Sequence, residues 1–136
     1  MLAWEQQKER GQEMAYVFTN PNPRGIFTGD CSVRAIAIAL DLTWDEAYAL
    51  LTEYGFMIKD MPNFDNVLGL VLGDRGFTKS VCPNCATVRE FARNHPDGIY
   101  VLRTGSHVVT VIDGDYYDTW DSGDEIPIMY WRKYGI

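Results

Sequence analysis

The chain of 136 residues is poor in basic residues, and this shortage narrows the range of possible partners. Lysine and arginine together number 12, against 19 aspartates and glutamates, which leaves a net charge of −7. Nucleic acids and anionic membranes bind proteins through an excess of positive charge, so we expect neither as the main partner. The sequence also lacks an apolar run of the about 18 residues that span a bilayer, and its polar beginning lacks the apolar core of a secretion signal. These absences favour a cytoplasmic protein.

Cysteine and histidine are scarce as well. Three cysteines are an odd number, which does not suit a disulfide framework, and we expect all of them to be reduced thiols. Only two histidines, His95 and His107, are present to act as a base or to ligate a metal. The composition is otherwise that of an ordinary globular protein, with 46% hydrophobic and 23% charged residues. We therefore predict a single domain over residues 1–136.

Capping motifs and apolar spacing predict a series of helices before residue 96. Asp30 is a favourable N-cap, and the segment that follows it is apolar on all sides, which indicates a central, buried helix. "TWDE" at 43–46 and "TVRE" at 87–90 are capping boxes, in which the threonine caps the helix and the glutamate reaches back. The predicted helices cover residues 2–10, 31–40, 44–54, 64–72 and 87–95, the first ended by Gly11, the third by Gly55 and the fourth by Gly73.

The pattern changes after residue 98. "GIYVLRTG" and "HVVTVIDGDYYDTW" are rich in β-branched and aromatic residues, which favour strands. Asp113-Gly114 is a strong two-residue hairpin turn between two strands, and "IPIMYWRK" predicts a last strand. Because helices come first and strands last, we predict an α+β fold. In it the N-terminal helices, including a central one that begins with a cysteine, pack on a C-terminal antiparallel sheet.

Cys31 lies at the polar edge of the apolar segment "TGDCSVRAIAIAL", where the central helix is predicted to begin. Unsatisfied N–H groups and the helix dipole favour an anion there, so the thiol should ionise easily, and the thiolate is the nucleophilic form. The plainer interpretation is a structural cysteine that acts as a small apolar filler. A catalytic role needs a base near the thiol. His95 stands at a predicted helix end, where a surface histidine suits the dipole.

His107 opens the predicted strand "HVVTVI", and the hairpin turn determines what lies beside it. A two-residue turn at Asp113-Gly114 pairs Val109 with Asp118. Side chains alternate between the two faces of a strand, so His107 and Val109 share a face. His107 and Asp118 then become diagonal neighbours on that face, within reach of one another.

The same register separates the other candidates near the histidine. Asp121 points to the opposite face, so Asp118 is the predicted partner of His107, and Trp120 stands opposite His107, where it can cover the imidazole from water. A carboxylate bonded to one ring nitrogen fixes the tautomer and leaves the other nitrogen to take a thiol proton. Cys31, His107 and Asp118 therefore form a candidate catalytic triad.

This order and setting resemble the papain-like superfamily of cysteine hydrolases, over roughly residues 20–121. There the cysteine opens a central helix, and the histidine and its Asn or Asp partner lie on an antiparallel sheet. "GDCSVRAIA" is similar to the cysteine motif of ovarian-tumour-type deubiquitinases, and "HVVTVIDGDYYD" looks like the histidine–aspartate hairpin of transglutaminase-like and bacteriocin-processing branches. The chain also looks like small papain-like proteins of bacteria and their phages. The resemblance implies cleavage of an amide, peptide or isopeptide bond in a protein or peptide substrate, without a cofactor.

Two positions depart from these families. Gly25 stands six residues before Cys31, where papain-like peptidases usually carry an oxyanion-hole glutamine, and Thr28 replaces the acid of the deubiquitinase motif. Asn20 and Asn22 are the nearest upstream amide side chains, and they are the candidate oxyanion donors beside the Cys31 N–H. The loss of such a donor costs about 10²–10³ in rate.

A second motif, Cys82-Pro83-Asn84-Cys85, lies between a possible strand and the helix predicted at 87–95. A plain loop is the favoured interpretation. The spacing also resembles the redox motif of glutaredoxin-like proteins, where a helix start lowers a thiol pKa and where Pro127 would imitate a cis-proline. A third interpretation is half of a zinc site, which needs four ligands and finds only His95 nearby.

The sequence as a whole predicts a cysteine hydrolase with Cys31 as nucleophile, His107 as general base and acid, and Asp118 as the orienting acid. Arg34, one helical turn after Cys31, is predicted to form a structural ion pair rather than to clamp a substrate. The first alternative is a non-catalytic protein-binding module on the same scaffold, such as a phage-type modulator of a host protein. The second is a dithiol redox protein that uses the Cys82–Cys85 pair.

Overall fold

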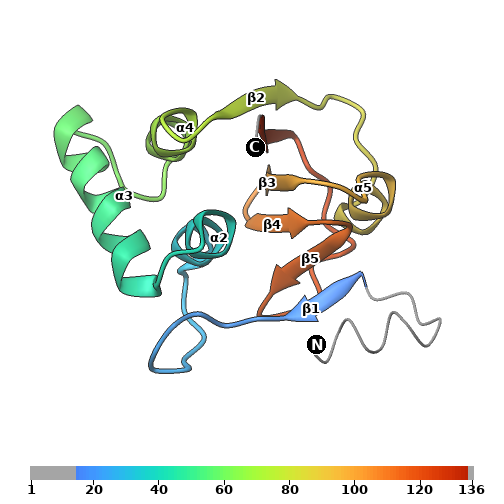
Figure 1. Ribbon diagram of the computed structural model, residues 1–136, viewed down its shortest axis with the longest axis horizontal. Helices are drawn as coiled ribbons and strands as arrows, with labels where there is room; N and C mark the ends of the chain where they lie inside the picture. The colour runs from blue at the N-terminus through green and yellow to red at the C-terminus, as the bar shows by residue number, and fades with distance from the viewer. Residues whose placement is uncertain (1–14, 135–136) are drawn as a thin grey trace.

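The computed structural model describes residues 15–134, so the helix predicted over 2–10 lies outside the described residues. Within this range four helices and six strands form a mixed α+β fold, which confirms the predicted class (Figure 1). In chain order the elements are β1 (Tyr16–Phe18), α2 (Cys31–Leu40), α3 (Trp44–Ile58), α4 (Asp65–Gly73), β2 (Phe77–Val81), α5 (Val88–Asn94), β3 (Ile99–Arg103), β4 (Val108–Ile112), β5 (Asp115–Asp118) and β6 (Met129–Lys133).

The six strands join one sheet in the order β1-β5-β4-β3-β6-β2. Every neighbouring pair is antiparallel except β1 with β5, which is parallel. The predicted order of helices before strands is therefore wrong in detail, because β1 precedes the described helices and β2 precedes α5. β1 spans only three residues, too few to show an alternating pattern in the sequence, and its pairing with β5 makes it a strand.

Helices cover both faces of the sheet. In β3, Val101 packs in a first core with α2, α3 and α4, whereas Tyr100 and Leu102 pack in a second core with α5. In Figure 1, α5 lies across the strands from the other three helices. Ile36 of α2 is fully buried in the first core, and truncation of such a side chain to alanine costs roughly 2–5 kcal/mol of stability. The apolar helix is thus central, as predicted.

The start of α2 follows the prediction in position but not in chemistry. Asp30 is the N-cap, yet its side chain makes no capping hydrogen bond to the helix backbone. Its carboxylate instead accepts hydrogen bonds from Arg34, Trp44 and Asn22. A guanidinium one turn away on the same helix competes better for a carboxylate than a neutral backbone N–H does.

The two threonine caps are confirmed, whereas one predicted helix end is wrong. Thr43 forms the full capping box with Glu46, and the Thr87 hydroxyl accepts from the Glu90 N–H. α3 continues past Gly55 to Ile58. A Cβ atom at Gly55 would lie 2.8 Å from the Asp60 carbonyl oxygen, so glycine is needed there for close backbone approach rather than for termination.

The hairpin turn between β4 and β5 has the predicted form. Asp113 and Gly114 have φ values of 49° and 88°, which is the pair of positive values that a type I′ turn requires. The ladder pairs Ile112 with Asp115 and the next two residues outward in the same register. The register of the hairpin is therefore the one that the sequence predicts, and it brings the start of β4 close to the end of β5.

Candidate active site

The three candidate residues come from three elements that meet at one end of the sheet. Cys31 is the first residue of α2, His107 immediately precedes β4, and Asp118 is the last residue of β5. The Thr110 hydroxyl donates a buried 2.7 Å hydrogen bond to the Ala35 carbonyl oxygen, which ties α2 to β4. This bond and the first core place the helix N-terminus beside the end of the sheet.

His107 and Asp118 are in direct contact. The His107 Nε2 lies 2.6 Å from Asp118 Oδ2, and the two residues are only 7% and 1% exposed. The regular ladder ends at the pair of Thr110 with Tyr117, so the contact forms just beyond it. Asp121 instead accepts from the Tyr116 hydroxyl and pairs with an arginine of α5. The choice of Asp118 over Asp121 as the histidine's partner is confirmed.

The Cys31 thiol is half-buried and lies beside His107 and the Val108 backbone, which both favour its ionised form. Because Asp118 engages Nε2, Nδ1 is the ring nitrogen available to the sulfur. The structure thus brings all three predicted residues together, with Asp118 in contact with His107 and His107 beside the Cys31 thiol.

The surroundings favour the ionised form of the cysteine–histidine pair. Burial opposes a charge on the thiol, but the hydrogen bonds from His107 and Val108 and the positive charges of His107 and Arg34 hold the pKa of Cys31 below its ordinary value. Burial likewise opposes a charge on the imidazole, yet the Asp118 and Cys31 contacts raise the pKa of His107 to about 9. The lowered pKa of Cys31 and the raised pKa of His107 both favour the thiolate–imidazolium form of the pair over the neutral form.

Asp118 has a full set of hydrogen-bond donors. Arg34 Nη1 and the Thr119 N–H donate to Oδ1 at 2.7 and 2.8 Å, and the Ser122 hydroxyl donates to Oδ2 at 2.6 Å. Burial alone would raise the pKa of Asp118, but the contacts with His107, Ser122 and Arg34 lower it. Ser122 was not singled out in the sequence, because a serine in a polar loop carries no periodic pattern that marks it as buried.

Trp120 lies against the histidine, as expected. The ring centroids of Trp120 and His107 are 5.0 Å apart, and the indole is 47% exposed. The indole therefore covers one side of the imidazole while the rest of its own surface faces solvent. Arg34 forms the predicted ion pairs, with Asp30 and Asp118 as its partners.

The two asparagines proposed as oxyanion donors are engaged within their own loop. The Asn20 amide donates to the Ile26 carbonyl oxygen at 3.2 Å, and its side-chain oxygen accepts from the Asn22 N–H. The Asn22 amide donates to Asp30 Oδ2 at 3.3 Å. These bonds hold the loop and the carboxylate before α2, so the Cys31 N–H stays the first candidate donor, because the first helical N–H groups lack intrahelical acceptors.

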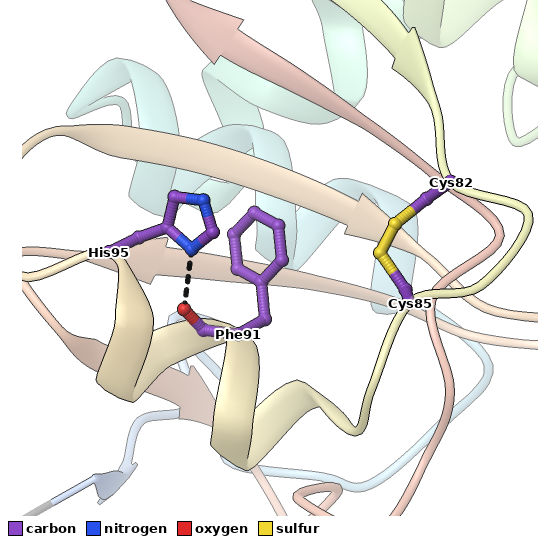
Figure 2. Close-up of a disulfide and its surroundings, with 4 residues drawn as sticks. All are labelled: Cys82, Cys85, Phe91 and His95. Atoms are coloured by element: carbon purple, nitrogen blue, oxygen red, sulfur yellow. Dashed lines mark hydrogen bonds between the residues drawn. A yellow bond between two sulfur atoms is a disulfide. The ribbon is translucent and has the colours of Figure 1, made fainter.

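Cys82 and Cys85 form a disulfide between β2 and α5 (Figure 2). The expectation of three reduced thiols is therefore wrong for this pair, and the interpretation of the motif as a plain loop is replaced by a disulfide-closed turn. The two sulfurs come together because the Cys85 N–H turns back to the Cys82 carbonyl oxygen at 3.4 Å. Sequence spacing allowed this pairing but did not require it.

His95 does not join the cysteines as a ligand. It caps the far end of α5, where its ring stacks on Phe91 with centroids 3.8 Å apart and its Nδ1 donates to the Phe91 carbonyl oxygen (Figure 2). No cluster of three or more potential metal ligands occurs among residues 15–134. The interpretation of the second motif as half of a zinc site therefore finds no set of ligands in the described residues.

Comparison with known proteins finds no relative of this chain. No family model, curated protein or solved structure matches the chain. In the described part of the chain, no helix has both the length and the apolar character needed to cross a membrane.

Proposed function

We propose that this protein is a cysteine hydrolase of papain-like arrangement, which cleaves an amide, peptide or isopeptide bond with Cys31, His107 and Asp118. The observation that carries the proposal is the buried chain of contacts from Asp118 through His107 to the Cys31 thiol at a helix start. Each member has the position that its role needs: the acid orients the base, and the base activates the nucleophile.

The proposed reaction has two steps. The Cys31 thiolate attacks the carbonyl carbon, and the C–N bond breaks as the His107 imidazolium donates its proton to the leaving amine, which leaves a thioester on the sulfur. Water then attacks the thioester, His107 takes its proton, and the C–S bond breaks to release a carboxylic acid and restore the thiolate. The Cys31 N–H and the α2 N-terminus favour the negative oxygen formed in each step.

Exposed aromatic side chains beside the triad support a protein or peptide substrate with apolar side chains. Phe18 is the register partner of Asp118, and its ring meets Phe27 edge to face with centroids 6.4 Å apart. Phe18 and Phe27 are 58% and 72% exposed, and Trp120 adds a third exposed ring beside His107. Exposed apolar groups gathered next to a reactive thiol are typical of a binding surface.

A thiol-directed activity probe with mapping of the labelled peptide tests the proposal. Wild-type protein should be labelled at Cys31 at neutral pH, and His107→Ala should lose most of the label. Cys82→Ser combined with Cys85→Ser is the matched control and should label like the wild type. A wild type that stays unlabelled at Cys31 while a denatured sample reacts there would contradict the hydrolase.

A non-catalytic binding module is the second candidate, and exposed side chains on a different surface favour it. Around the end of α3 and the start of α4, Phe56, Met57, Met61 and Phe64 are each at least half exposed, as is typical of protein-binding patches. Capture of partners with Cys31→Ser, followed by incubation of each with the wild type, separates the two. Partners that are captured but never altered in mass would favour the binding module.

The dithiol redox interpretation draws on the Cys82–Cys85 disulfide itself. It predicts that the pair exchanges electrons with a small dithiol and that Cys82→Ser abolishes the exchange. The hydrolase predicts that Cys82→Ser leaves turnover intact, so the same variant distinguishes the two functions.

A further inference from the structure

Arg34 is a buried charge in a helix that carries no other charged residue. It is 6% exposed and lies one turn after Cys31, on the same helix. A buried guanidinium is costly unless it is paired and hydrogen-bonded. Arg34 meets this demand with two carboxylates at once: Nε donates to Asp30 Oδ1 at 2.8 Å and Nη1 donates to Asp118 Oδ1 at 2.7 Å.

Arg34 thus bridges Asp118 and Asp30, and Asp30 is held by further hydrogen bonds of its own. Asp30 Oδ2 accepts from the Trp44 indole N–H at 2.9 Å and from the Asn22 amide at 3.3 Å. Asp30 is buried, like Arg34 and Asp118. The bridge therefore connects the loop before α2, α2 itself, the start of α3 and the end of β5.

We propose that Arg34 is a positioning residue of the candidate active site, whose guanidinium fixes the Asp118 carboxylate in the orientation that holds His107. The inference rests on the proposed function. Arg34 and the Thr119 N–H occupy Oδ1, so the carboxylate cannot rotate that oxygen toward the imidazole. Oδ2 then stays with His107 and the Ser122 hydroxyl.

Arg34 has a second effect, because its positive charge helps to hold the pKa of Cys31 below its ordinary value. The groups that face this network come from every element around it. They are Tyr16 of β1, Asp30 before α2, Cys31 and Arg34 of α2, His107 before β4 and Asp118 of β5. Arg34 therefore contributes in two ways that can be tested separately: its charge acts on the Cys31 thiol, and its hydrogen bonds orient Asp118.

Two substitutions separate these contributions. Arg34→Lys keeps the charge, but one ammonium does not reproduce the fork that reaches both carboxylates. Its kcat should fall by about 10²-fold, as for a misplaced catalytic group, with KM and the thiol pKa unchanged. Arg34→Gln also removes the charge, so the midpoint of the rate of Cys31 alkylation against pH should rise.

Arg89→Lys is the matched control, because Arg89 also bridges two aspartates, Asp121 and Asp124, but from α5. It should change neither kcat nor the alkylation profile. Circular dichroism and Tm establish that each variant folds. If Arg34→Gln does not fold, Arg34→Lys and Asp30→Asn decide, since both should lower kcat at constant KM. Unchanged kcat in folded Arg34→Lys and Asp30→Asn would overturn the proposal.

The alkylation profile needs no substrate, so the two proposals fail separately. A wild type without hydrolase activity, in which Arg34→Gln still moves the Cys31 profile upward, refutes the hydrolase and supports the effect of Arg34 on the thiol. An active wild type whose kcat and alkylation profile are the same in every folded Arg34 variant supports the hydrolase and overturns the role of Arg34.

Discussion

Cys31 and Cys85 both lie close to the start of a helix, Cys31 at the first residue of α2 and Cys85 two residues before the cap of α5, but their surroundings differ. Cys31 contacts a buried histidine that is itself held by a carboxylate. Cys85 contacts another cysteine and the second core. Proximity to a helix start is therefore not enough to make a thiol a candidate nucleophile; a base that can take its proton decides.

The largest expected effect is that of replacing the proposed nucleophile. Cys31→Ser should lower turnover by about 10⁴-fold or more, because serine is nearly isosteric but far less acidic, and loss of a nucleophile removes the covalent step. Cys82→Ser and Cys85→Ser should each retain turnover within about twofold of the wild type, since neither touches the reacting atoms. Steady-state kinetics on a captured substrate make the measurement. Equal losses at all three cysteines would remove the distinction between the two sites.

The second effect separates Asp118, at the end of β5, from Asp121 in the loop that follows. Asp118→Asn should lower kcat by about 10²-fold or more, because an amide does not stabilise the imidazolium as a carboxylate does. Asp121→Asn is the control, since Asp121 contacts Tyr116 and Arg89 rather than His107. The kinetic assay should show little change for Asp121→Asn. A larger loss for Asp121→Asn than for Asp118→Asn would contradict the assignment.

The third effect concerns the reactivity of the Cys31 thiol. His107→Ala removes the hydrogen bond and charge that lower the pKa of Cys31 and leaves the burial that raises it. The thiolate fraction at pH 7 should drop, and alkylation by iodoacetamide should slow by roughly tenfold or more. Mass spectrometry of the Cys31 peptide against time gives the rate. An unchanged rate would mean that His107 does not activate the thiol.

The fourth effect appears in stability against pH. The folded pKa of His107 is about 9, above its ordinary value near 6.5. Protonated His107 therefore stabilises the fold fully below about pH 6.5, and this stabilisation is lost as the pH rises through 9. The lowered pKa of Cys31 gives the opposite slope, because the thiolate stabilises the fold fully only above the unfolded thiol's pKa near 8.5.

These opposite slopes should leave the wild-type Tm nearly flat between about pH 7 and 8.5. Cys31→Ala removes the slope of the thiol but keeps the Asp118 contact, so its Tm should fall by about 3–5 °C across the same range. Thermal unfolding followed by circular dichroism measures both. If the Tm of Cys31→Ala stays as flat as that of the wild type, the cysteine–histidine pair is not ionised near neutral pH.

The smallest expected effect is that of reducing the disulfide. Reduction of Cys82–Cys85 should raise the number of alkylated cysteines from one to three while turnover stays within about twofold, because the disulfide packs near the second core rather than at the triad. A parallel assay of activity and thiol count before and after reduction tests this. A large change in activity would connect the two sites.

Much of the local structure could be predicted because its causes lie within a few residues of one another. The Thr43 and Thr87 caps each need only a threonine and the N–H three residues ahead. The Asp113-Gly114 turn sets the register of one hairpin, and that register carries His107 to Asp118. Residues brought together in this way are determined by sequence spacing alone.

Other features depend on segments that are distant in the sequence, and only the tertiary structure decided them. β1 is a strand because β5, far along the chain, lies beside it. Arg34 joins the Asp118 network because the end of the sheet meets the start of α2. Spacing and capping rules describe neighbours along the chain, whereas these contacts arise only when packing of the two cores fixes where α2 and α5 lie on the sheet.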